Sequence, residues 1–199
     1  MRIIDLIAVV AATFVACGGA ARADAAPAPS SVADAMIQVA DRVCRPAADT
    51  QTPPANFAAT AGYGREASQP PNLPVGTTAL DTWRAPSPEG RLYVMSGVFP
   101  ESTTPGTCLV ALYDAGADGL AQRIGAYVLG LKRGFVLNPR YDITTKVMHL
   151  TRYDRRVGDT LHSVMIMDAI DPKPGQPTEV LAAFTVDYGW VLHPGRARQ

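Results

Sequence analysis

Two histidines in the C-terminal third have the most obvious potential for chemistry. His149 and His162 lie in the runs 144–153 and 160–167, whose β-prone residues predict neighbouring strands. If partner numbers in these strands sum to 311, the two imidazoles meet on one face, as a metal site requires. A slip of one residue sends them to opposite faces, and the pattern places no acidic third ligand. We therefore expect a structural or surface role for both and predict no metal site.

Three methionines near these histidines raise the alternative of a copper-handling protein. Met148, Met165 and Met167 lie on the same two predicted strands, and thioether sulfur suits Cu(I). In the register that pairs the histidines, however, the methionines face away from them. Methionine more often fills gaps in an apolar core. We therefore expect neither a metal nor a cofactor.

A charged run follows the first of these strands. Arg152, Arg155 and Arg156, with Asp154 among them, predict a hairpin turn. Such a turn is either solvated or able to hold a phosphate or carboxylate through bidentate guanidinium contacts. We prefer the solvated turn.

Four aspartates at predicted strand ends could act as general acids or bases. They are Asp114, Asp118, Asp168 and Asp171. Aspartate is equally common there as a turn or cap residue, and no motif pairs these four with a base or nucleophile. The sequence has no serine-hydrolase elbow, zinc-protease motif, phosphate-binding loop or dinucleotide fingerprint. We predict no catalytic residue, and an envelope hydrolase that uses a strand-end aspartate or a histidine is kept as an alternative.

The first 23 residues have the layout of a secretory signal. Arg2 precedes an apolar run, and Ala21-Arg22-Ala23 forms a cleavage site. Alternatively, Phe14-Val15-Ala16-Cys17 resembles a lipobox, in which Cys17 is lipidated and anchors the protein. Both interpretations place the protein in the bacterial periplasm or cell envelope, with no transmembrane span in the mature chain. They also leave two thiols, which usually pair in an oxidising compartment.

These two cysteines are expected at the contact between a helix and a sheet. Residues 31–43 carry an apolar stripe at helical spacing, and Pro46 is expected to end the helix just after Cys44. Cys108 lies in the predicted strand 107–114, on the same side as Val110 and Leu112, which should face the core. We therefore predict a Cys44–Cys108 disulfide, which stabilises the fold by about 4 kcal/mol in the loop-entropy model.

The remaining pattern predicts one α+β domain over residues 31–199, after a flexible lead-in at 24–30. Residues 46–90 are rich in proline and are expected to form a long loop that holds one short helix at 53–62. Strands are predicted at 91–99, 107–114, 144–153, 160–167 and 179–190, and a second helix at 117–134. We expect an antiparallel meander sheet of about five strands with two helices packed on one face. Four aromatic residues either line a groove or anchor the Pro-rich loop, the second being preferred: Tyr63, Trp83, Tyr93 and Phe99.

Charge and resemblance limit the choice of function. Without residues 1–23 the chain has 16 basic and 17 acidic side chains, out of 18 of each, and no basic run that would attract nucleic acid. The helix ending in Cys44-Arg45-Pro46, the Phe57 to Tyr63 segment, Trp83 and the Cys108 strand resemble small exported α-proteobacterial proteins of unknown function, over residues 31–135. The resemblance implies export and a disulfide. We expect a non-catalytic domain that binds a protein partner or small ligand through the Pro-rich loop and an exposed sheet edge or face.

Overall fold

A computed structural model describes residues 28–68, 70, 78–98, 107–116, 118–158 and 160–188. The predicted signal segment with Cys17, most of the lead-in, and Phe99 lie outside these residues. Part of the Pro-rich region, residues 71–77, also lies outside them.

The described residues form one antiparallel sheet of nine strands. The strands are β1 Gly64–Glu66, β2 Thr78–Ala85, β3 Arg91–Val98, β4 Cys108–Tyr113, β5 Val136–Leu137, β6 Ile143–Thr144, β7 Met148–Val157, β8 Thr160–Ala169 and β9 Pro177–Tyr188. Their order is β1-β2-β3-β4-β9-β8-β7-β5, with β6 also paired to β7. The α+β class is confirmed, but the expectation of about five strands in a meander is wrong. Four strands are additional: β1, β5 and β6 have only two or three residues, too few to show alternation, and β2 lies in the segment expected to be a loop. In addition, β9 inserts between β4 and β8.

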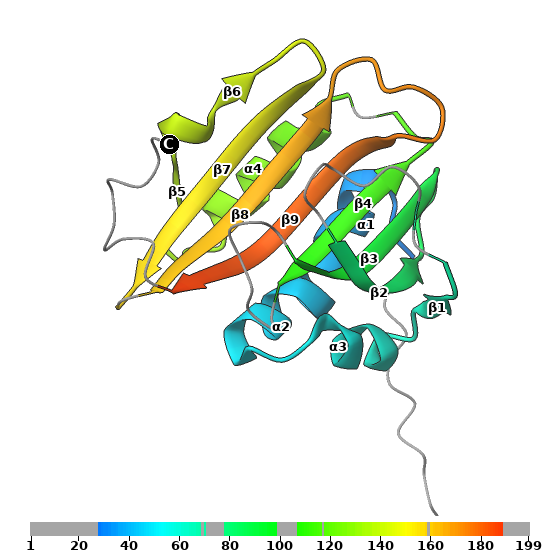
Figure 1. Ribbon diagram of the computed structural model, residues 1–199, viewed down its shortest axis with the longest axis horizontal. Coiled ribbons are helices and arrows are strands. Elements are labelled where there is room, and N and C mark those ends of the chain that lie inside the picture. Colours follow the sequence, from blue (N-terminus) through cyan, green and yellow to red (C-terminus); the bar gives the residue numbers. More distant parts are fainter. Residues whose placement is uncertain are drawn as a thin grey trace, which may run out of the picture.

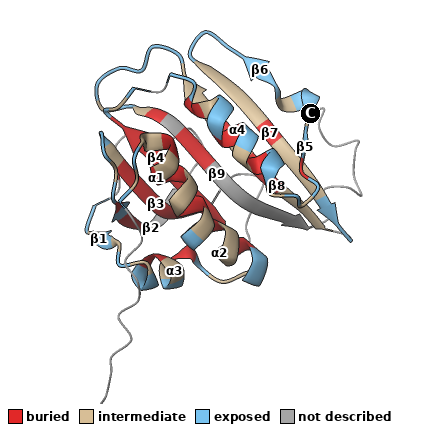
Figure 2. Cartoon of the chain, turned by 180° about the vertical axis from the view of Figure 1, so that it is seen from behind, coloured by how far each residue is buried: buried red, intermediate tan, exposed pale blue. Residues whose placement is uncertain are grey.

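The helices gather on one face of this sheet, as expected. They are α1 Val32–Val39, a π-helical turn Ala40–Cys44, α2 Arg45–Thr50, α3 Pro54–Thr60 and α4 Leu120–Gly130, with a 3-10 turn at Pro139–Tyr141. Helices α1 and α4 lie behind the sheet in Figure 1 and in front of it in the reverse view of Figure 2. The number of helices exceeds the predicted two because the first helix continues past Cys44 into α2.

The prediction that Pro46 ends the first helix is wrong. Arg45 keeps right-handed helical geometry, with φ −63° and ψ −51°. Its N–H bonds to the carbonyl of Ala40, five residues back, so the helix widens into a π turn. Proline has no N–H to donate and fits the first turn of the following helix, where α2 begins. The widened turn lets the helix pass through Pro46.

The Pro-rich segment 46–90 is therefore not one long loop. Prolines stand at the starts of α2 and α3, and β1 and β2 occupy other parts of the segment. The predicted short helix is confirmed as α3, and Gly62, with φ +76°, lies in the turn that follows it. The first residues of a helix do not need to donate a backbone hydrogen bond within the helix, so proline is tolerated there. The prolines of this segment therefore lie at the starts of helices and do not indicate that the segment lacks secondary structure.

The predicted disulfide is confirmed and lies at the centre of the core. Cys44 and Cys108 are bonded, with Cα atoms 5.2 Å apart, and both are fully buried. Val110 and Leu112 join them on the helix side of the sheet, as the alternation of β4 predicts. A second group of buried residues packs on the other face of the sheet: Tyr93, Met95, Leu109, Ala111, Tyr113 and Val180.

Helix α4 approaches the sheet closely at one glycine. A Cβ at Gly125 would collide with the hydroxyl of Tyr153 on β7, so only glycine allows this spacing. The helix ends at Gly130, and two residues after it, Lys132 and Gly134, have positive φ angles of +53° and +77°.

Candidate functional site

The register between β7 and β8 decides which candidate residues meet. Partner numbers sum to 317, not 311, so His149 stands opposite Asp168, and His162 stands opposite Arg155. The two histidines share a face but are six residues apart along the ladder, roughly 20 Å. The paired-histidine register is therefore wrong. A tight turn sets the true register, because Val157 pairs with Thr160 and Gly158 has φ +58°.

The pairing of His149 with Asp168 lies in a concave site that we name the His149 pocket. Its volume is about 390 Å³. It is lined by Gly119, Ala121, Gln122, Leu137, Asp142, His149, Thr151, Tyr153 and Asp168. Because residues alternate along β7, His149, Thr151 and Tyr153 all face the helix side. Helix α4 begins only at Leu120, so the end of the sheet beyond its first turn is left open.

The outer wall of the pocket is a segment that we name the arm, residues 136–144, which contains β5 and β6. Asn138 ties the arm to β7 twice, through its N–H to the Arg152 carbonyl at 2.8 Å and through its side-chain amide to Asp154 at 2.6 Å. The Arg152 guanidinium lies over the ring of Tyr141, 4.7 Å from its centroid. These contacts position Asp142, the next residue, at the pocket.

Of the charged groups in the pocket, His149 and Asp142 contact each other, whereas Asp168 has no such contact in the described part of the chain. His149 Nε2 lies 2.8 Å from an Asp142 carboxylate oxygen, and the two side chains are 36% and 48% exposed. Asp168 is half-buried and, among the described residues, its carboxylate has no hydrogen-bond or ion-pair partner. Burial raises the pKa of Asp168 above the ordinary aspartate value, and His149 lowers it by a smaller amount. Burial, followed by the charge of Asp142, raises the pKa of Tyr153.

The predicted arginine-rich turn does not exist, because the arginines belong to β7. Arg152 is 1% exposed, on the face away from α4, and bonds to Asp154 at 2.7 Å and Ser163 at 2.8 Å. Arg155 points to the opposite face, over Phe135. Strand alternation separates Arg155 from Arg152 and Arg156, and Arg156 donates to the Gly158 carbonyl at 3.0 Å instead. The three guanidinium groups therefore form no common anion site.

His162, beside Arg155, is away from the pocket. Burial lowers the pKa of its imidazole, and the positive charge of Arg155 lowers it further. The methionines do not reach His149 either, since Met165 stands opposite Arg152, and Met167 packs against the second apolar group. Within the described chain, no cluster of three or more His, Cys, Asp or Glu side chains could hold a metal ion.

The other predicted residues lie elsewhere. Asp114 forms an ion pair with Arg91 at 2.6 Å, while Asp118 and Asp171 are in exposed turns. Of the aromatic residues, Trp83 is buried in the helix-side core with Tyr63 packed against that core, and Tyr93 is in the opposite group. These aromatic side chains pack in the two apolar cores and do not line a groove. Sequence reasoning missed Asp142, whose position depends on the arm.

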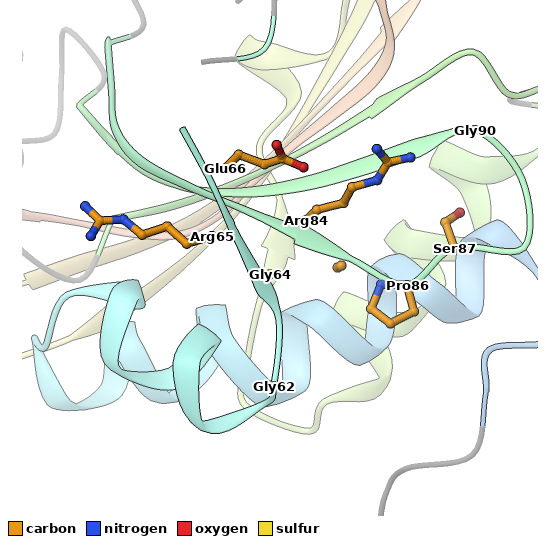
Figure 3. Close-up of a pocket in the computed structure, with 9 residues that line it drawn as sticks. Gly62, Gly64, Arg65, Glu66, Arg84, Pro86, Ser87 and Gly90 are labelled. Carbon is orange, nitrogen blue, oxygen red and sulfur yellow. The ribbon is translucent and has the colours of Figure 1, made fainter. Parts of the chain in front are cut away.

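A second hollow at the opposite edge of the sheet lacks such convergence (Figure 3). Its volume is about 470 Å³, and it is lined by Gly62, Gly64, Arg65, Glu66, Arg84, Ala85, Pro86, Ser87 and Gly90. Arg65 points away from Arg84, toward Asp81, with which it pairs at 2.7 Å. Arg84 is exposed and has no partner among the described residues. We therefore take the His149 pocket as the candidate site.

Three comparisons with known proteins give no relative. No protein-family model, curated protein or solved structure matches the chain. In the part of the chain that the structure describes, no helix is long and apolar enough to cross a membrane. Functional inference therefore depends on the geometry of the pocket.

Proposed function

We propose that the protein is an exported binding domain that holds a small polar ligand in the His149 pocket. The observation that carries the proposal is the half-buried carboxylate of Asp168, unpaired among the described residues and next to the His149–Asp142 pair. Partial burial removes some of the water around this carboxylate, which raises its pKa. A ligand that donates a hydrogen bond to Asp168 would replace part of the lost hydration.

Two features favour a small ligand over a protein partner. The site is concave, with a few polar groups that converge, which is typical of small-molecule pockets. Its floor is the rigid β7–β8 ladder, so the polar atoms are held in place before a ligand arrives. The Pro-rich loop, expected to bind a partner, supplies none of the lining residues.

Export is supported by the buried disulfide and by the signal-like residues 1–23. A structural disulfide persists in oxidising compartments and is rare in the cytosol. Lipidation of Cys17 is the alternative form of the same proposal, because an envelope anchor leaves the pocket unchanged. Mass analysis of the mature N-terminus separates cleavage before Asp24 from a lipid on Cys17.

The test is an NMR screen in which small polar molecules are added to the wild type and to the Asp168→Asn variant, and their binding to the two proteins is compared. We expect ligands that shift the amide signals of Thr151 and Asp168 in the wild type and bind at least tenfold more weakly to Asp168→Asn. Asp114→Asn is the matched control, because it removes an exposed carboxylate far along the chain and asparagine also tolerates its positive φ. Ligands that bind equally well to the wild type and Asp168→Asn would contradict the proposal.

An envelope hydrolase is the second candidate, favoured by one observation. The raised pKa of Asp168 suits a general acid, and His149 with Asp142 resembles an oriented base. The high exposure of His149 and Asp142 argues for binding instead, because catalytic electrostatics are strongest where water is excluded. Turnover of nitrophenyl esters, phosphates or glycosides that His149→Ala abolishes would establish the hydrolase, and stable substrates would eliminate it for these classes.

A further inference from the structure

The charges that face the His149 pocket are mostly negative. Asp142 and Asp168 are carboxylates, and His149 is the only basic side chain among the described lining residues. His149 is already engaged by Asp142 at 2.8 Å. Asp168 therefore faces the hollow without an ion pair among the described residues, although the nearby His149 lowers its pKa slightly.

The first turn of α4 contributes the opposite partial charge. Gly119, before the helix, provides no side-chain cap, and the turn lines the pocket. A helix N-terminus is equivalent to about half a positive charge, which is smaller than the charge of two carboxylates. An anionic ligand would meet this half charge together with like-charge repulsion from Asp142 and Asp168. The balance favours a cation.

Three exposed apolar side chains, which we name the lip, lie at the pocket and beyond it: Leu137 lines the pocket, and Val147 and Ile170 lie farther along the β7–β8 ladder. Leu137, Val147 and Ile170 are 43%, 68% and 43% exposed, high fractions for large apolar side chains. The N–H of Ile170 bonds to the Val147 carbonyl at 2.8 Å, which extends the β7–β8 ladder by one pair. By alternation, both side chains lie on the same face as His149. The Tyr153 ring lies at the inner end, where an aromatic face attracts a cation.

The geometry points to an organic cation, an ammonium or guanidinium group with a short apolar substituent, as the ligand of the His149 pocket. This inference rests on the proposed function and names its ligand class. The cationic group donates hydrogen bonds to Asp168, and the apolar part covers Val147 and Ile170. A metal ion fits less well, since no three ligating side chains converge in the described residues.

The experiment titrates the purified exported protein with three probes of similar shape and different charge: benzylamine, benzyl alcohol and benzoate. We expect benzylamine to bind at least tenfold more tightly than the other two, with signal shifts at Thr151 and Asp168. Its affinity should fall several-fold when salt rises from 50 to 500 mM, because exposed charges are screened. Asp168→Asn should weaken benzylamine by at least tenfold and benzyl alcohol hardly at all.

A surface variant keeps the test independent of folding. Val147→Lys adds a positive charge to the lip at a largely exposed position. It removes the same apolar contact from both probes, so it should weaken benzylamine several-fold more than benzyl alcohol, because only benzylamine is repelled by the new charge. Val157→Lys is the matched control, since Val157 is 46% exposed at the other end of β7. Equal effects of the two lysines on benzylamine would overturn the inference.

The failures are distinguishable. If benzyl alcohol or benzoate shifts the pocket signals as strongly as benzylamine, the cationic class is wrong and the proposed function stands. If benzylamine binds equally to the wild type and Asp168→Asn, Asp168 does not hold the ligand, and both the inference and the proposed function are contradicted. If neither these probes nor the screened molecules shift the signals of Thr151 and Asp168, the inference and the proposed function fail together.

Discussion

Breaking the Cys44–Cys108 bond is the perturbation whose magnitude follows most directly from the structure. The two cysteines are 64 positions apart, so their bond closes a loop of that size in the unfolded chain and reduces its conformational entropy. In the loop-entropy model this closure stabilises the folded state by about 4 kcal/mol at 25 °C. Small domains have total stabilities of about 5–15 kcal/mol, so the loss is a large fraction of the whole.

The assay compares urea unfolding of the oxidised and the reduced protein. Both forms have the same side chains, so the difference in the free energy of unfolding measures the effect of the covalent bond and not the loss of packing that follows when the sulfur atoms are removed. The Cys44→Ala, Cys108→Ala double variant should lose more than the reduced protein, because both positions are fully buried and alanine leaves a cavity. We therefore expect the urea midpoint to be highest for the oxidised protein, lower for the reduced protein and lowest for the double variant.

Two results would refute this reasoning. A difference below about 1 kcal/mol between oxidised and reduced protein would show that the bond does not restrict the unfolded chain as the loop model requires. Reaction of both thiols with an alkylating reagent, with no reductant present, would show that the purified protein lacks the bond.

Three further predictions concern packing, buried charge and pH. Gly125→Ala should destabilise the protein by about 1–3 kcal/mol in thermal unfolding, because the new Cβ meets the hydroxyl of Tyr153. Gly130→Ala is the control: its Cβ has open space around it, so it should stabilise α4 by up to about 1 kcal/mol. Asp154→Ala should cost about 3–5 kcal/mol in urea unfolding, because it removes a partner of the buried Arg152. Since the pKa of Asp168 is raised on folding, its ionisation opposes folding, so Asp168→Asn should be more stable than the wild type at pH 7. That gain should vanish as the pH falls below the ordinary aspartate pKa, and its persistence in acid would contradict the assignment.

Most of the long elements were predictable because each carries many residues of one period, but the eight-residue strand β2 was missed because it lies in the Pro-rich segment that was expected to be a loop. The apolar stripe of residues 31–43 and the alternation of β4 placed Cys44 and Cys108 on facing surfaces, which was sufficient to predict their bond. The β3–β4 and β7–β8 hairpins follow from the same alternation. Strands β5 and β6, with two residues each, have no period to detect, and they form because β7 offers an edge for pairing.

The candidate site was less predictable than the fold because it depends on register and on the arm. A tight turn at Gly158 places His149 opposite Asp168 and not opposite His162, a choice of register that the strand pattern alone cannot decide. Asp142 reaches His149 because Asn138 ties the arm to Arg152 and Asp154. These are contacts between distant residues, for which the chain has no local signal.

The place of β9 in the sheet has a consequence for how the protein is made. It is the last strand along the described chain, yet it pairs with β4 on one side and β8 on the other. Until β9 has been synthesised, the earlier strands form two separate halves with unpaired edges. Such distant pairing slows folding, because the sheet closes only when the last described strand is present. A chain truncated before β9 should therefore expose both edges and tend to aggregate.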